Sequence, residues 1–503
     1  MTGNRFRRFR VLAAVLLGLA VATAALGADD PVASGTRLFE KRRYGEAAAV
    51  LRPYLSSAGP GPGAPGQAAL VLGAAYLKNA ALHRALHRTS VIVHLEYLKT
   101  LSMEKGRGRS SLADLYLGEA LLAAGKPREA KTPLTKFLAR AGKGTAEGAI
   151  AAVDLGLCHH RLGEAQKAKS LWSGVDAADP DVKTELAAAY LSAGMGEKAA
   201  VSMCEEALAS LAKSGRRPSM RALKNIVGVY ARAGRTEKGL DLLAAADPKR
   251  FSREEVPGKD KVIHFHDLAL LDGLATLYGR ASIAWLEKAA ADPKAGDAAA
   301  YYLQEAYALG GIGGPSARAA DPFGAAPKMP QAYKDRMTVR QAADRYAAGR
   351  KGEATRLWDD FSRKRPADPD LLAEIVLACD RVAADCRDIV GRAAVIAETG
   401  EGKRFRGLHS ALGRHFLDRK DYAKALFHLE AGRDKGNKNK VESNDPELLA
   451  ALAEAYYRVK KFSEAQEIYF EMSKSFPAVR QIQDALQGIY SREQKSPGDV
   501  RIL

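Results

Sequence analysis

Long apolar runs are scarce in this chain of 503 residues, and strand-like alternation of apolar and polar side chains is nearly absent. Only residues 11–26 form a continuous apolar segment, so we expect no membrane span in the remainder. Aromatic residues make up only 7% of the chain. Alanine and leucine dominate the apolar residues, a balance that favours helices over strands. The composition therefore predicts an all-α protein.

Sequence motifs for catalysis and cofactor binding are missing as well. The glycines of 310–314 follow no strand and precede no Lys-Ser or Lys-Thr pair, so they do not form a phosphate-binding loop. No Gly-x-Ser-x-Gly elbow or paired-carboxylate cleft can be placed. His83 and His87 would share a helix face, but they lack a third metal ligand and are interpreted as an exposed basic face. We therefore expect no enzyme activity, no cofactor and no metal.

The first 28 residues have the features of a secretory signal. Residues 1–10 are polar and basic, residues 11–26 are apolar, and Gly27 and Ala28 are small. We therefore predict export to the periplasm, where the mature chain is soluble or peripherally associated with the membrane. The alternative is an uncleaved segment that anchors the chain, because the apolar run is just long enough to cross a bilayer.

The chain has four cysteines, and an exported compartment permits them to form disulfides. Cys379 and Cys386 are the best local pair. On one continuous helix they would lie about 10 Å apart, too far for a bond, so they can bond only if a turn near 383–385 joins two helices. The alternative is that these two, Cys158 and Cys204 are all unpaired, partly buried thiols.

Helical segments recur along the chain in pairs, with a spacing of about 31 to 45 residues. In each pair, a small residue on the first segment is followed twelve positions later by a small residue on the second. The coupled positions are Gly35–Ala47, Gly73–Ala85, Gly118–Ala130, Gly156–Ala168, Ala187–Ala199, Ala269–Ala281, Ala342–Ala354, Gly413–Ala425 and Ala453–Ala465. Further signature residues follow the second small residue: Trp172, Trp285 and Trp358 by four positions, and Pro180, Pro293, Pro366 and Pro477 by twelve.

This pattern resembles the tetratricopeptide repeat (TPR), here of an exported bacterial type, over residues 35–490. The resemblance implies a right-handed superhelical solenoid of antiparallel helix pairs. We expect an N-terminal solenoid over 29–310, a Gly/Pro-rich linker or loop over 311–333, and a C-terminal solenoid with a capping helix over 334–503. The break at 311–333 either divides two superhelical halves or is a simple loop insertion.

In the family the first helix of each pair lines a concave groove. The resemblance places a candidate partner-binding set in it: Arg221, Lys224, Asn225, Arg232, Arg414, Tyr457 and Arg458. The first four would form a cationic patch for an acidic peptide or carboxylate. A second set is apolar and would either hold a partner's amphipathic helix or pack against the chain's own next helix. Its members are Leu70, Leu77, Leu115, Leu122, Val153 and Leu157.

The net charge of +18 favours acidic partners. We expect protein partners in the groove, with an acidic glycan or an anionic membrane surface as alternatives, and no nucleic acid, because no motif for its recognition is present. The leading hypothesis is a non-enzymatic scaffold of the bacterial cell envelope that assembles or supports a multiprotein complex. The alternatives are an accessory protein for polymerisation or export of an acidic exopolysaccharide, and an envelope enzyme with an unrecognised site.

Overall fold

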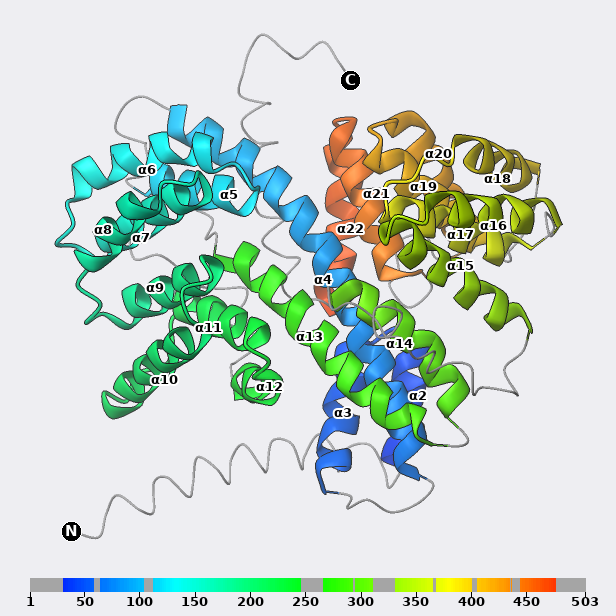
Figure 1. Ribbon diagram of the computed structural model, residues 1–503, viewed down its shortest axis with the longest axis horizontal. Coiled ribbons are helices and arrows are strands. Elements are labelled where there is room, and N and C mark those ends of the chain that lie inside the picture. The colour runs from blue at the N-terminus through cyan, green and yellow to red at the C-terminus, as the bar shows by residue number, and fades with distance from the viewer. Residues whose placement is uncertain are drawn as a thin grey trace.

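The computed structural model describes residues 30–57, 64–103, 112–245, 266–292, 295–310, 331–364, 368–399, 405–434, 436 and 444–475. These residues form 21 helices, α2 to α22, and contain no strand (Figure 1). None of these helices is long and apolar enough to cross a membrane. The predicted leader at 1–28 and the capping helix at 479–493 lie outside the described residues, as does most of the predicted linker, since α15 already begins at Gln331.

The predicted all-α fold of adjacent, packed helix pairs is confirmed. Eight short helices follow the first long one: α5 (Ala113–Ala123), α6 (Pro127–Ala141), α7 (Ala146–Arg161), α8 (Ala165–Ser173), α9 (Pro180–Ser192), α10 (Glu197–Lys213), α11 (Met220–Arg232) and α12 (Thr236–Ala245). Eight more form the C-terminal part: α15 (Gln331–Ala347), α16 (Lys351–Lys364), α17 (Pro369–Arg381), α18 (Arg387–Thr399), α19 (Arg406–Asp418), α20 (Tyr422–Gly432), α21 (Pro446–Arg458) and α22 (Phe462–Ser475). The remaining five are α2 (Pro31–Glu40), α3 (Tyr44–Ser57), α4 (Ala64–Met103), α13 (His266–Ala290) and α14 (Gly296–Gly310).

Local sequence explains where the short helices begin and how they pair. Asp179 precedes Pro180 and accepts hydrogen bonds from the first free backbone N–H groups of α9, which caps the helix. Within a pair, the helices approach closely because a glycine on the first faces a large side chain on the second. A Cβ added at Gly118 would lie 2.4 Å from Leu134, and one at Gly156 would lie 2.4 Å from Trp172. The small-residue spacing thus reports real backbone proximity in these pairs.

Two predicted helix pairs are wrong, because each is a single long helix. The positions Gly73 and Ala85 both lie in α4, and Ala269 and Ala281 both lie in α13. The two long helices pack against each other in antiparallel fashion, with Gly73 facing Leu286 and the ring of Tyr76 stacked 5.6 Å from that of Tyr278. Each of the two helices therefore packs against the other, about two hundred residues away in the sequence, rather than against its own next segment.

The helices α4 and α13 are shared by two closed rings of helices (Figure 1). In one ring, contacts run from α4 through α5, α7, α9 and α11 to α13; we call this the N-lobe. In the other, they run from α13 through α14, α15, α17, α19 and α21 back to α4; we call this the C-lobe. The predicted boundary at 311–333 falls between α14 and α15, which both belong to the C-lobe.

The C-lobe ring is closed by polar contacts between α21 and α4. Thr89 donates a hydrogen bond of 3.1 Å to Glu454, and Arg88 lies 3.1 Å from the same carboxylate. Tyr457 donates to Glu96. A continuous apolar core also runs from α4 into α5 on one side and into α21 and α22 on the other. Tyr457, expected to bind a partner, is therefore buried in this intramolecular interface.

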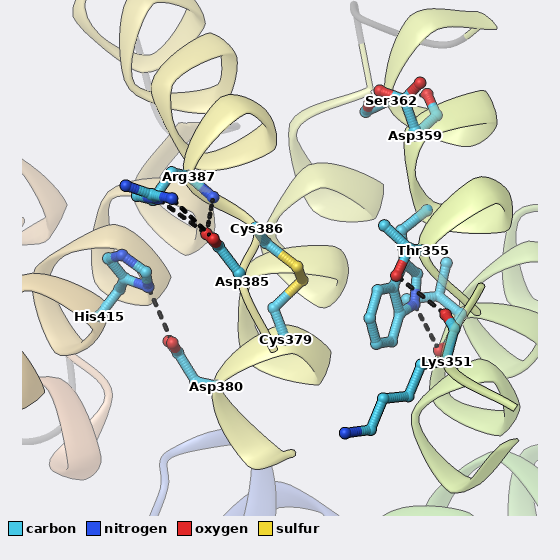
Figure 2. Close-up of a disulfide and its surroundings, with 12 residues drawn as sticks. Lys351, Thr355, Asp359, Ser362, Cys379, Asp380, Asp385, Cys386, Arg387 and His415 are labelled. Carbon is cyan, nitrogen blue, oxygen red and sulfur yellow. Dashed lines mark hydrogen bonds and ion pairs between the residues drawn. A yellow bond between two sulfur atoms is a disulfide. The ribbon is translucent and has the colours of Figure 1, made fainter. Parts of the chain in front are cut away.

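Cys379 and Cys386 form a disulfide across the turn between α17 and α18, with an S–S distance of 2.17 Å (Figure 2). Ala383 has a positive φ of 50° at this turn and allows the two helices to reverse direction. Cys158 and Cys204 are buried and unpaired. The disulfide therefore forms under the condition stated from the sequence, a turn near 383–385 that joins two helices.

We predict that Gly73→Ala destabilises the protein by about 1–3 kcal/mol, because the added methyl group would lie 2.7 Å from Leu286 Cγ and 3.1 Å from its backbone nitrogen. The free energy of unfolding in urea would measure the effect. Gly45→Ala is the matched control, since nothing lies within 4 Å of the added Cβ in α3. Equal stability of the two variants would show that α4 and α13 do not touch as described.

Candidate functional site

Each ring encloses a cavity lined by its inner helices. The N-lobe cavity has a volume of about 290 Å³ and receives side chains from α4, α5, α7, α9, α11 and α13. The C-lobe cavity is larger, about 460 Å³, and receives side chains from α4, α14, α15, α17, α19 and α21. Charged residues form most of the C-lobe lining and a large part of the N-lobe lining, which makes these cavities the candidate sites.

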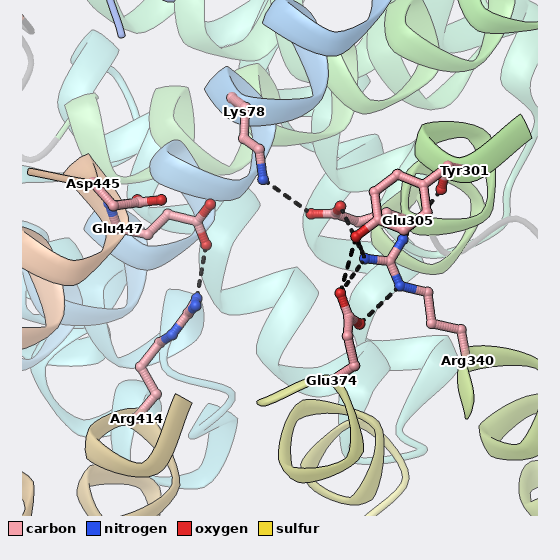
Figure 3. A network of polar contacts seen from close by, with 8 residues as sticks. All are labelled: Lys78, Tyr301, Glu305, Arg340, Glu374, Arg414, Asp445 and Glu447. Carbon is pink, nitrogen blue, oxygen red and sulfur yellow. Dashed lines mark hydrogen bonds and ion pairs between the residues drawn. The ribbon is translucent and has the colours of Figure 1, made fainter. Parts of the chain in front are cut away.

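In the C-lobe cavity, basic and acidic side chains interlock (Figure 3). Arg340 forms a two-pronged pair with Glu374, at 2.7 and 2.9 Å, and its guanidinium stands 4.4 Å from the ring centroid of Tyr301. Lys78 Nζ lies 3.4 Å from Glu305 Oε1. Such paired charges are less costly to bury than isolated ones. The lining is therefore polar yet internally ordered.

For two arginines of the C-lobe cavity, the contacts with neighbouring residues offset the cost of burial less completely. Burial lowers the pKa of Arg381, and the attraction of Asp344 at 3.2 Å offsets only part of this effect. Arg414 donates to Glu447 at 2.8 Å, but its buried Nε has no acceptor among the described residues. Five basic residues face four acidic ones in the lining: Lys78, Arg84, Arg340, Arg381 and Arg414 against Glu305, Glu374, Asp445 and Glu447. The lining therefore holds one basic residue more than it holds acidic ones, while Asp344, outside the lining, pairs with Arg381.

Arg414 is the one residue of the predicted binding set that lines the C-lobe cavity. Arg458 lies outside both linings, 3.6 Å from Glu454 and with its guanidinium 5.8 Å from the ring centroid of Tyr422. Arg340 and Arg381 were not identified from the sequence. Arg340 lies two residues before the small Ala342, as Asp154 and Glu185 of the N-lobe lining lie two residues before Gly156 and Ala187, and this spacing could have singled it out.

The predicted patch on α11 lies at the N-lobe cavity. Lys224, Asn225 and Arg232 contribute to its lining, and Arg221 is buried alongside them. The patch differs from the expected free cationic surface. Arg221 lies 2.7 Å from Glu119 and 2.9 Å from Glu185, and Lys224 lies 3.7 Å from Glu185.

Further polar contacts complete this neutralisation of the patch. Asn225 donates to Glu185 at 3.0 Å, and Arg232 lies 3.3 Å from Asp272. The carboxylates that neutralise the patch come from α5, α9 and α13, and sequence reasoning missed all three. Arg221, Lys224 and Asn225 are therefore buried against other inner helices, whereas the side chain of Arg232 is paired but 44% exposed.

The buried charges of Glu185, Arg221 and Lys224 stabilise one another, as the pKa shifts of Glu185 and Arg221 show. Burial would raise the pKa of Glu185, but Lys224 and Arg221 outweigh it and hold that pKa at about 2. Burial alone would lower the pKa of Arg221, but Glu119 and Glu185 raise it overall. Both groups are therefore charged at neutral pH, and each depends on the other for its burial.

The apolar set expected in the groove packs inside the chain, and two of its members, Leu122 and Leu157, also line the N-lobe cavity. Leu70, Leu77, Leu115, Leu122, Val153 and Leu157 are all buried in hydrophobic core clusters. Within the described part of the chain, no group of three or more His, Cys, Asp or Glu residues could hold a metal ion. His83 is buried rather than exposed as predicted; its ring nitrogen lies 2.6 Å from Asn79 O, and burial lowers its pKa to about 4.

No known protein family and no curated protein matches this sequence. Among solved structures, yeast Tom70 is 11% identical, covering 93% of this chain and 96% of its own, with a TM-score of 0.31. The APC/C hetero-tetramer Cut9–Hcn1 is 13% identical, covering 94% and 98%, with a TM-score of 0.26. The P58(IPK) TPR domain is 15% identical, covering 76% and 99%, with a TM-score of 0.22. At these scores the likeness carries no argument about function, which must come from this chain's own geometry.

We predict that Glu185→Gln destabilises the protein by about 3 kcal/mol at neutral pH, because it leaves Arg221 and Lys224 buried with one carboxylate fewer. The folded-state pKa of Glu185 is about 2, below its usual 4.5, so its contribution is complete above pH 4.5 and is lost as the pH falls towards 2. Urea unfolding from pH 7 downwards should show the difference from wild type shrinking below pH 4.5. The control is Glu197→Gln on the exposed side of α10, which should stay near wild type throughout.

Proposed function

We propose that this chain is an exported, non-enzymatic scaffold of the bacterial cell envelope that binds an acidic segment of a protein partner in its C-lobe cavity. One observation carries the proposal. Four basic side chains from four different helices line a single cavity: Lys78, Arg340, Arg381 and Arg414. The buried Nε of Arg414 has no hydrogen-bond acceptor among the described residues, so a ligand oxygen could accept from it.

The C-lobe cavity suits a carboxylate better than a neutral or basic group. Guanidinium groups bind carboxylates through charge-assisted hydrogen bonds, and these strengthen where water is excluded. A ligand carboxylate near Arg381 and Arg414 would restore the charge balance that burial disturbs at Arg381. The acidic residues of the lining would at the same time oppose binding of highly charged anions, so the site favours a segment with few, spaced carboxylates.

We predict that Arg381→Ala and Arg414→Ala each weaken binding of an acidic peptide about tenfold, as expected for loss of one charge-assisted hydrogen bond. The probe is a fluorescein-labelled peptide of alternating glutamate and serine, measured by fluorescence anisotropy at low and moderate salt. The matched control is Arg363→Ala on the outer helix α16, whose side chain is 68% exposed and pairs with Asp359 outside the cavity.

Three comparisons make this binding test decisive. A lysine–serine peptide of equal length should not bind, because the lining of the cavity has more basic than acidic residues. Tighter binding of an oligogalacturonate than of the peptide would favour the exopolysaccharide role over the protein-binding role. Peptide binding that is equal in all three arginine variants would remove the C-lobe cavity as the site.

Export is supported by the leader and by the disulfide, since disulfides persist in oxidising compartments. We predict that the full chain made in bacteria appears in the periplasm, begins near Ala28 or Asp29, and has Cys379 and Cys386 oxidised. Removal of residues 1–28 should leave both thiols reduced and open to alkylation under denaturing conditions. Mass spectrometry of the fractionated chain would check this; an intact leader on a membrane-bound chain would favour the anchored alternative.

A further inference from the structure

The N-lobe cavity contains a carboxyl group that the ion pairs described so far do not use. Asp154 lies on α7, is only 4% exposed and contributes to the cavity lining. Its Oδ2 atom is buried and has no hydrogen-bond partner among the described residues. A buried acceptor without a donor is costly, so this position calls for an explanation beyond packing.

The cations that attract Asp154, Lys224 and Arg221, are already paired with two other carboxylates. Glu119 on α5 and Glu185 on α9 are matched by Arg221 and Lys224 on α11, two carboxylates against two cations. Asp154 is therefore a third carboxyl group beside a cluster that is already balanced.

The other charged and titratable groups near this cavity are also engaged. On α11 and α13, Arg232 pairs with Asp272. On α7 itself, Arg161 donates to Leu122 O at 2.8 Å and lies seven residues from Asp154, about 10 Å along the helix. His87 reaches the lining from α4, and burial lowers its pKa, which favours the neutral ring. None of them supplies a cation for Asp154.

We propose that the N-lobe cavity binds one ammonium or guanidinium group of a ligand, and that Asp154 Oδ2 accepts its hydrogen bond. The ligand cation supplies the charge that the cluster lacks and the donor that the buried oxygen lacks. A cavity of about 290 Å³ admits a group the size of one lysine or arginine side chain. The two lobes then bind groups of opposite charge, which goes beyond the acidic segment assigned to the C-lobe.

Binding at this site has a proton signature. Burial, with the repulsion of Glu185 and Glu119, raises the pKa of Asp154 well above its usual value, against the opposing attraction of Lys224 and Arg221. A bound cation favours the ionised carboxylate, so it lowers this pKa and releases the proton wherever the free carboxyl is protonated. Affinity should therefore rise with pH while the free carboxyl is protonated, by up to about tenfold per pH unit.

The experiment is isothermal titration calorimetry with butylammonium and with a capped Gly-Lys-Gly peptide, which distinguish a free amine from a peptide side chain as the source. Butanol and the norleucine form of the peptide are the uncharged controls. Repeating the titration over a range of pH in buffers of different ionisation enthalpy measures the proton release, which should approach one proton per ligand bound at the pH values where the free carboxyl is protonated.

Asp154→Asn keeps the side-chain shape but removes the charge, so binding should weaken at least about tenfold and proton release should disappear. Glu147→Gln is the matched control, because it lies on the exposed side of the same helix, and it should bind as wild type does. The proton release of the unaltered chain tests the proposal even if Asp154→Asn does not fold. Equal binding of butanol, unchanged binding by folded Asp154→Asn, or no binding of either cation would each overturn it.

Discussion

Close approach of two long helices, α4 and α13, is the constraint on which the remaining architecture depends. Their backbones can approach because Gly73 of α4 leaves room for Leu286 of α13. A glycine also admits the next helix of the N-lobe ring, since Gly273 of α13 lies against Gly228 of α11. An open stack of helix pairs would expose one face at each end. Here the stack instead returns twice to the same two helices, so α4 and α13 form the common wall of both rings and position every inner helix around a cavity.

Ring closure explains why the inner faces can carry charges. In an open groove, a charged side chain has water as its partner, whereas in a closed ring the inner helices face one another across a short gap. Arg221 thus meets Glu119 from a helix about a hundred residues earlier, and Arg340 meets Glu374 from the next pair. Each pairing offsets the desolvation that closure imposes, whereas Asp154 Oδ2 and Arg414 Nε are among the buried atoms without a hydrogen-bond partner in the described part of the chain.

The sequence predicts the short helix pairs well because their determinants are local: an Asp-Pro start, a small residue that admits a close neighbour, and a large residue sixteen positions on. The prediction of a helix pair at 73–85 is wrong, although the sequence contains an indication of the single long helix α4: no glycine or proline interrupts residues 74–103, so nothing there ends a helix. The candidate sites were predictable only in part. The inward position of Lys224 follows from the resemblance to the repeat family, but its pairing with Glu119 depends on ring closure, which no local pattern specifies.

The two cavities therefore differ in kind although they share a wall. We propose a ligand cation beside Asp154 in one cavity and a ligand carboxylate beside Arg381 and Arg414 in the other. The two linings meet at α4, where His87 contributes to the N-lobe lining and Arg84, three residues earlier, to the C-lobe lining. A partner segment that engages one lobe contacts helices that also pack in the other, because α4 contributes to both linings and to the core between them. Binding in one lobe could affect the other without a domain movement, if ligand contacts shift α4 relative to α13. Because Gly73 and Leu286 are in close contact, even a small shift of α4 would move α13 as well.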